Sequence, residues 1–130
     1  MNNPKTLQFS DPSVVSSLAE LSDEDLDRVN FGVIVFDQLG IVQRYNQYEC
    51  DYTGLQKARV LGCHVFTDIA QCMNNFMVAQ KFEDAAAAGL PLDQTIDYLL
   101  TWRMRPTPVA LRMVRLLKSP LNYLLLKRLA

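Results

Sequence analysis

The chain has 130 residues, of which 49% are hydrophobic, enough for one domain with its own core. Its 13 basic and 14 acidic side chains give a net charge of −1, which argues against a nucleic-acid-binding protein. No stretch approaches the roughly 20 apolar residues of a membrane span. We therefore expect a soluble, cytoplasmic protein that binds neither nucleic acid nor membrane.

The first thirty residues show the pattern of two short helices. Apolar side chains recur at helical spacing between Val14 and Leu21, directly after the turn-forming residues 11–13. Ser22 and Asp25 then have the spacing of a capping box, which starts a second helix. We expect residues 1–30 to form an N-terminal helical cap and residues 31–130 to form the core of a single domain.

A hairpin is predicted next. The continuous apolar run from Phe31 to Phe36 is typical of a strand that is covered on both faces. Residues 37–40 supply a turn, and residues 41–45 supply the returning strand. Short helices should follow in residues 46–66.

The second half of the chain predicts one longer helix and three strands. Residues 75–88 have a helical apolar face and stop at Gly89, a usual helix C-terminal residue. From Thr95 the apolar period changes to two, and strands are expected over residues 95–104, 109–117 and 122–129. The predicted fold class is α+β, a five-stranded antiparallel sheet with short helices on one face and the N-terminal cap on the other.

Potential ligand-binding side chains recur every fourth residue in the segment RYNQYECDYTG. If this segment is helical, Tyr45, Glu49 and Thr53 share one face. Cys72 lies further along the chain and offers a thiol that could hold a small molecule against these donors. The three cysteines have no paired spacing typical of a zinc site, so we expect no metal and reduced thiols.

The strand order and several segments resemble the photoactive yellow protein family of the PAS superfamily. The segments are FGVIVFD, RYNQYECDYTG, DIAQC, KFEDAAAAG, DYLLTWRMRPT and LLLKRL. The resemblance implies a PAS-like fold and a blue-light photoreceptor that binds p-coumaric acid (4-hydroxycinnamic acid) as a thioester on Cys72. It also implies that Tyr45 and Glu49 bind the phenolate oxygen, with Thr53 supporting Tyr45.

The resemblance also suggests a pocket wall, formed by Val65, Tyr98, Leu100, Met104 and Leu55. Met104 matches a methionine implicated in returning the chromophore to its dark isomer. Leu55 stands where the family has an arginine that shields the chromophore. Because leucine carries no positive charge, the phenol pKa is expected to be higher here than in arginine-bearing relatives.

In the mechanism that this resemblance suggests, light isomerises the chromophore and Glu49 gives its proton to the phenolate. The buried carboxylate is then left without a partner, and the cap loosens. The expected partners are the chromophore and an unknown downstream signalling protein, for a monomer or weak homodimer. The four arginines from Arg103 to Arg115 are expected to be solvated strand positions.

Two other functions remain open at this point. The first is a PAS domain without a covalent chromophore, used for protein interaction or a reversible ligand. The second is a thiol-dependent enzyme built on Cys72 or Cys63, the latter being next to His64, the sole histidine. We expect a signalling module that is not an enzyme.

Overall fold

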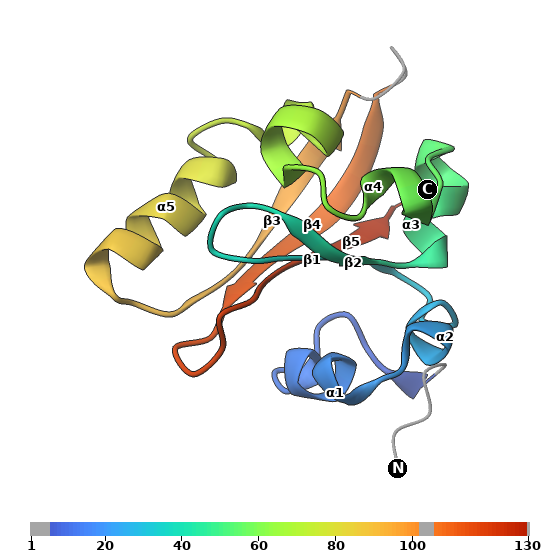
Figure 1. Ribbon diagram of the computed structural model, residues 1–130, viewed down its shortest axis with the longest axis horizontal. Coiled ribbons are helices and arrows are strands. Elements are labelled where there is room, and N and C mark those ends of the chain that lie inside the picture. The colour runs from blue at the N-terminus through green and yellow to red at the C-terminus, as the bar shows by residue number, and fades with distance from the viewer. Residues whose placement is uncertain (1–5, 102–105, 130) are drawn as a thin grey trace.

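A five-stranded antiparallel sheet forms the centre of the computed structural model, which describes residues 6–101 and 106–129 (Figure 1). The strand order is β2-β1-β5-β4-β3, so the first and last strands of the chain are neighbours in the middle. The strands are β1 (Gly32–Phe36), β2 (Val42–Tyr45), β3 (Leu92–Leu100), β4 (Thr107–Arg115) and β5 (Asn122–Arg128). The predicted sheet is confirmed.

Helices cover both faces of this sheet. The N-terminal cap, residues 6–30, contains α1 (Val14–Glu20) and α2 (Asp23–Leu26) and lies on one face (Figure 1). The other face carries the remaining helices, which are α3 (Gln47–Thr53), α4 (Lys57–Val60), the π-helix η2 (Val65–Ile69), the 3-10 helix η3 (Gln71–Met73) and α5 (Ala79–Ala88). The sequence-predicted layers are thus present, and the capping box is confirmed because the Ser22 side chain accepts a hydrogen bond from the Asp25 amide.

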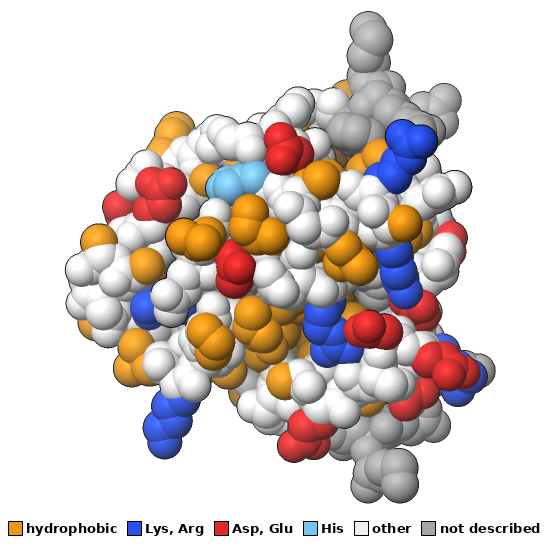
Figure 2. Space-filling view, in the orientation of Figure 1, with side chains coloured by type: hydrophobic (Ala, Val, Ile, Leu, Met, Phe, Trp, Pro, Cys, Tyr) orange, Lys and Arg blue, Asp and Glu red, His pale blue; other side chains and the backbone are white. Residues whose placement is uncertain are grey.

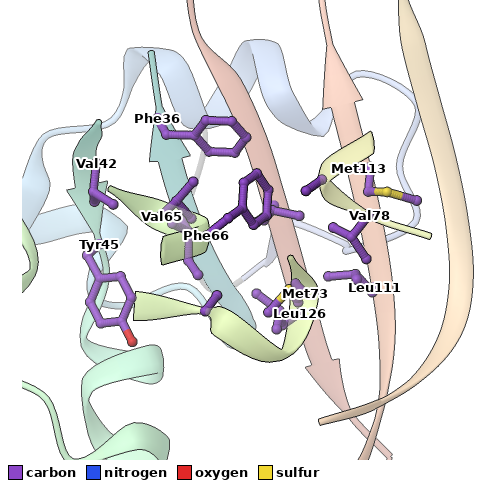
Figure 3. Close-up of a cluster of buried hydrophobic side chains, with 14 of the residues drawn as sticks. Phe36, Val42, Tyr45, Val65, Phe66, Met73, Val78, Leu111, Met113 and Leu126 are labelled. Carbon is purple, nitrogen blue, oxygen red and sulfur yellow. The ribbon is translucent and has the colours of Figure 1, made fainter. Parts of the chain in front are cut away.

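Alternation along the central strands divides the core into two clusters. All five residues of β1 are buried, with Ile34 and Phe36 in the cluster under α5 and Val33 and Val35 in the cluster under the cap. This division explains why the strand is apolar at every position. In Figure 3, Tyr45 lies at one edge of the first cluster, with its hydroxyl pointing away from Phe36.

Several predicted boundaries are wrong by a few residues, and β4, for example, runs over Thr107–Arg115 instead of residues 109–117. Helix α5 begins at Ala79 instead of residue 75, because the Asn75 side chain accepts hydrogen bonds from the amides of Met77 and Val78 and holds them in a turn. Strand β3 begins at Leu92, ahead of the alternating pattern, because its first residues pair with residues 113–115 of β4. Pairing with a neighbour extends this edge strand beyond what its own sequence indicates.

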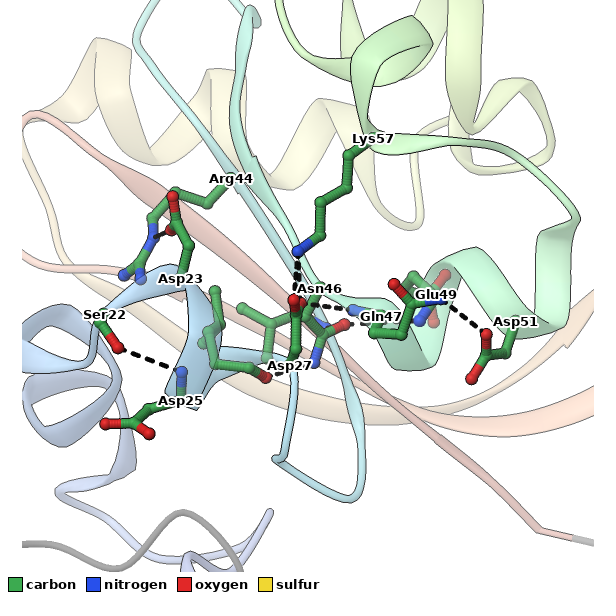
Figure 4. A network of polar contacts seen from close by, with 12 residues as sticks. Ser22, Asp23, Asp25, Asp27, Arg44, Asn46, Gln47, Glu49, Asp51 and Lys57 are labelled. Atoms are coloured by element: carbon green, nitrogen blue, oxygen red, sulfur yellow. Dashed lines mark hydrogen bonds and ion pairs between the residues drawn. The ribbon is translucent and has the colours of Figure 1, made fainter.

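Polar side chains of the core fasten the cap. Arg44 donates hydrogen bonds to the carbonyl oxygens of Leu18 and Leu21 at 3.1 and 2.7 Å and pairs with Asp23 at 2.9 Å (Figure 4). Nearby, Lys57 of α4 forms an ion pair with Asp27, which follows α2 (Figure 4). The cap is therefore bound through charged contacts as well as through its apolar face.

Arg112 corrects a sequence-based expectation. Its side chain is 5% exposed, and it donates to the carbonyl oxygens of Phe9 and Asp11, each at 2.8 Å, while pairing with Asp93. The hydrogen bonds to Asp93 are the main cause of a raised pKa of Arg112. The expected solvated arginine is instead an anchor of the cap, whereas Arg103 and Arg105 lie outside the described residues.

The outer surface mixes charge and apolar groups. On the face drawn in Figure 2, basic side chains lie apart from one another among acidic and hydrophobic ones. None of the helices within the described ranges is long and apolar enough to cross a bilayer.

Candidate functional site

A cavity of about 150 Å³ lies between the sheet and the helices α3, η2 and η3. Strands supply one side of it and the helices supply the other. Its lining residues are Ile34, Tyr45, Glu49, Tyr52, Thr53, Ile69, Ala70, Cys72, Met73, Leu100, Thr107, Leu126 and Arg128. Four residues that the sequence singled out, Tyr45, Glu49, Thr53 and Cys72, therefore meet at one cavity.

Helix α3 positions the polar side of the cavity. Asn46 caps the start of the helix, where its side chain accepts a hydrogen bond from the Glu49 amide, and Gly54 caps the end with a left-handed φ of 77°. Thr53 donates its hydroxyl hydrogen to the Glu49 carbonyl oxygen at 2.8 Å. The Tyr45 hydroxyl lies 3.0 Å from the Thr53 hydroxyl, and since Thr53 has a single hydrogen, Tyr45 is the donor of that bond.

Burial favours the protonated forms of Tyr45 and Glu49. It raises the pKa of Tyr45 well above its ordinary value of 10, so the hydroxyl remains a hydrogen-bond donor at neutral pH. The side chain of Glu49 is 3% exposed, and burial raises the pKa of its carboxyl group, while Arg128 opposes that rise. A buried acid whose pKa is raised in this way is a candidate proton donor in the chemistry of a site.

Gly32 makes room for Glu49. A Cβ atom at Gly32 would lie 2.0 Å from Glu49 Oε1, far inside van der Waals contact. The glycine that opens the apolar run of β1 is thus required for the acid to enter the core. The sequence carried a signal for this, because glycine is unfavourable in a buried strand unless something approaches its backbone closely.

Arg128 is a site residue that the sequence reasoning missed. Its Nη1 forms an ion pair with Glu49 Oε1, and its side chain is 6% exposed. The guanidinium also lies 5.3 Å from the ring centroid of Tyr48 and 4.4 Å from that of Tyr52. Two tyrosines four residues apart on a helix can hold a cation, but the sequence does not show that the end of β5 reaches them.

Cys72 is held in η3 by bonds to its backbone. The Tyr98 hydroxyl and the Asn75 side-chain amide both donate to the Cys72 carbonyl oxygen, and Asn75 also donates to Tyr98 at 2.7 Å. The thiol itself is partly buried and free of any disulfide. These bonds fix the backbone that carries the sulfur at the wall of the cavity.

The expected wall residues divide into three groups. Leu100 lines the cavity, as the resemblance implied. In the described lining, Val65, Tyr98 and Leu55 do not appear, because Val65 is fully buried in the apolar cluster while Tyr98 and Leu55 pack against that cluster from its edge. Met104 lies outside the described residues.

The cysteine-histidine pair considered for thiol chemistry has other contacts. His64 Nδ1 accepts hydrogen bonds from the amides of Phe66 and Thr67, which places it at the start of η2. The Cys63 thiol donates to the Arg59 carbonyl oxygen. Within residues 6–101 and 106–129, no three His, Cys, Asp or Glu side chains are grouped as a metal site.

The comparisons with known proteins point to one family. A scan against family models finds no match. Over 123 residues, 95% of the chain and 98% of the relative, the chain is 32% identical to photoactive yellow protein from Halochromatium salexigens. It is 28% identical to photoactive yellow protein from Rhodothalassium salexigens, over 94% of the chain and 97% of that relative.

Solved structures agree with the sequence relatives. The photoactive yellow protein domain of the sensor histidine kinase Ppr from Rhodospirillum centenum matches with a TM-score of 0.79 at 26% identity, covering 86% of this chain and 97% of that one. The PAS domain of the RpfR quorum-sensing receptor from Cronobacter turicensis shares the fold, with a TM-score of 0.57 at 17% identity over 81% of this chain and 99% of that one. With these relatives and this cavity, the chain belongs to the photoactive yellow protein family and has its PAS fold.

Proposed function

We propose that this protein is a blue-light photoreceptor that carries p-coumaric acid as a thioester on Cys72, and that it acts as a signalling module and not as an enzyme. The observation that supports this most is the meeting of Cys72, Tyr45 and Glu49 at one cavity in a member of the family. The cavity volume of about 150 Å³ is of the order that accepts one aromatic ring.

Attachment is a simple acyl transfer. The thiolate sulfur of Cys72 forms a bond to the carbonyl carbon of an activated p-coumaric acid. The bond from that carbon to the activating group breaks, and the departing group takes up the proton that the thiol released when it ionised. Three free cysteines suit a reducing compartment such as the cytoplasm.

The polar side of the cavity would keep the ring oxygen ionised. A phenol has an ordinary pKa of about 10, so a phenolate at neutral pH needs about 4 kcal/mol of stabilisation. Hydrogen bonds to a charged group contribute about 1.5 to 3 kcal/mol each, so two donors reach the required scale. Tyr45 would turn its hydrogen from Thr53 to the ring oxygen, and protonated Glu49 would be the second donor.

The contacts of Asn46 suggest how a change at Glu49 would reach the cap. Asn46 is fully buried, and its side-chain amide donates to the carbonyl oxygens of Leu26 and Phe31 at 3.2 and 2.9 Å. Its side-chain oxygen accepts from the amides of Val33 and Glu49. When light isomerises the chromophore and Glu49 gives up its proton, a shift of α3 would disturb this one side chain and loosen residues 6–30.

Loosening of the cap would expose the face of the sheet that the cap now covers, and a downstream signalling protein could bind there. That face contains buried apolar residues such as Val33, Val35 and Leu125. Their exposure would give a partner an apolar surface that is absent in the dark. We expect a monomer or weak homodimer before the partner binds.

Reconstitution tests the proposal. Purified apoprotein is mixed with activated p-coumaric acid and analysed by intact mass, peptide mapping and visible absorbance. We expect a yellow product that is heavier by one coumaroyl group and modified at Cys72. Cys72→Ser should stay unmodified, whereas the matched controls Cys50→Ser and Cys63→Ser should load like the native protein.

Other outcomes would favour the other functions. Absence of any adduct would support a PAS module that binds a partner or a reversible ligand. Repeated turnover of the acyl donor would support a thiol-dependent enzyme. An adduct that forms equally well in Cys72→Ser would contradict the assigned attachment site.

A further inference from the structure

Arg128 is a buried cation for which the mechanism above has no role. Its side chain is 6% exposed, and it lines the cavity together with Glu49. Its Nη1 contacts the Glu49 carboxyl group, while its Nε is buried and has no hydrogen-bond partner among the residues that the structure describes.

The aromatic rings of α3 hold Arg128 independently of Glu49. Tyr48 and Tyr52 have ring centroids 4.8 Å apart, and the guanidinium lies over both rings. The backbone amide of Arg128 also donates to the Tyr48 hydroxyl at 3.3 Å. Cation-π contacts of this kind stabilise a guanidinium in place, so the positive charge stays at the cavity even when Glu49 is neutral.

The charges of the site must balance in a buried space. Arg128 supplies one positive charge, and Glu49 and a bound phenol are two acids that compete for it. Like charges this close cannot both be ionised in a buried site at low cost, so the two acids share one proton. The other titratable groups near Glu49, Tyr45 from β2 and Cys50 on α3, have pKa values raised by burial and remain neutral at pH 7.

We propose that Arg128 is the resident counter-ion of Glu49 and pairs with its carboxylate whenever Glu49 has lost its proton. Glu49 loses its proton in two situations, and only the second of them rests on the proposed function. One is the pocket without chromophore. The other is the light state, in which the O–H bond of Glu49 breaks, the phenol O–H bond forms, and the electron pair left on the carboxylate accepts a hydrogen bond from Arg128.

An ion pair with Arg128 would change the mechanism that the resemblance suggested. There, the ionised acid was left without a partner, and the whole burial penalty drove the cap open. With Arg128 beside it, part of that penalty is offset by the ion pair. The cap of this protein should therefore open less than it would if the arginine were absent.

The first test uses protein without chromophore, so it does not depend on the proposed function. Isotope-edited infrared spectroscopy follows the Glu49 carboxyl group during a pH titration, with Glu49→Gln assigning the band. Replacing Arg128 with Gln should move the titration midpoint upward by about one to three pH units. The matched control Lys127→Gln removes the same charge from the neighbouring, exposed residue of β5 and should leave the midpoint in place.

A second variant controls for the possibility that Arg128→Gln does not fold. Arg128→Lys keeps the charge and should keep the midpoint close to that of the native protein. A midpoint that is unchanged in Arg128→Gln, or that moves by the same amount in Lys127→Gln, would overturn the counter-ion assignment.

The second test uses the loaded protein and measures hydrogen exchange of backbone amides in residues 6–30 in darkness and in light. Arg128→Gln should increase the light-induced rise in exchange severalfold over the native protein, and Lys127→Gln should not. An equal rise in all three proteins would overturn the role of Arg128 in the light state. Failure to form any coumaroyl adduct would instead reject the proposed function. The infrared titration would then still show whether Arg128 is the counter-ion of Glu49.

Discussion

Glu49 is the residue on which the proposed chemistry depends, and its surroundings give it two opposing influences. Burial favours the neutral acid, which could donate a hydrogen bond to a phenolate, whereas Arg128 favours the carboxylate. The balance between them decides where the proton of the site resides. A small change in either influence should therefore have a measurable effect on protonation.

The first residue-scale prediction concerns stability against pH without chromophore. The pKa of Glu49 in the folded protein is raised above its ordinary value of 4.5, so the folded state keeps this proton at pH values where the unfolded chain has lost it. The contribution of Glu49 to the free energy of unfolding should fall as pH rises from about 4.5 through the folded pKa. Urea unfolding at a series of pH values, compared between the native protein and Glu49→Gln, measures this.

The comparison isolates one group, because the other acids are the same in both proteins. The difference in unfolding free energy, native minus Glu49→Gln, should decrease with increasing pH over that window. A difference that is flat or increases would contradict the raised pKa.

The second residue-scale prediction concerns Gly32. Gly32→Ala would place a methyl group against the Glu49 carboxyl, so we expect a loss of about 1 to 3 kcal/mol in unfolding free energy. The control is the same substitution in a Glu49→Ala background, where the clash is removed and the loss should shrink. Equal losses in both backgrounds would show that the methyl group meets something other than Glu49.

At the scale of elements, one side chain joins three of them. Asn46 caps the start of α3, binds the end of α2 through Leu26 and contacts β1 through Val33. Because Asn46 lies between Glu49 and the cap, α3 connects the cavity with the cap. The element that carries the acid also carries the attachment of the cap.

Asn46→Ala tests this attachment. The variant leaves several buried backbone groups without partners, and we expect a loss of about 2 to 4 kcal/mol, with faster hydrogen exchange in residues 6–30. The matched control Gln47→Ala alters the adjacent, exposed side chain and should change stability by less than about 0.5 kcal/mol. Protection of the cap that survives in Asn46→Ala would show that other contacts hold it.

Element types could be predicted from sequence because their signals are local. The apolar run of β1, the alternation in β3 as far as Leu100 and the glycine after α5 each depend on neighbouring residues. The start of α5 could not be predicted, because the side chain of Asn75 competes with the helix for its first amides. Glu49 and Thr53 share a face of α3, as their spacing indicated, but Tyr45 is not on that helix. It lies at the end of β2 and meets Thr53 because the chain passes directly from β2 into α3.

At the scale of the whole molecule, the contacts that sequence reasoning missed join distant parts of the chain. Arg112 binds the carbonyl of Phe9, 103 positions away, and Arg128 pairs with Glu49, 79 positions away. Each arginine lies on a strand whose local pattern is compatible with a solvated side chain. Only the folding of the cap and of α3 against the sheet shows that both are buried.

In the function proposed here, the fold keeps a ring oxygen ionised inside the cavity while Cys72 holds the other end of the chromophore. The most direct test is a titration of visible absorbance for the loaded protein, in the folded state and after unfolding in urea. We predict that the folded protein keeps its yellow phenolate band at pH 7 and loses it on unfolding. A ring oxygen that titrates near its ordinary value of about 10 in both states would contradict the account.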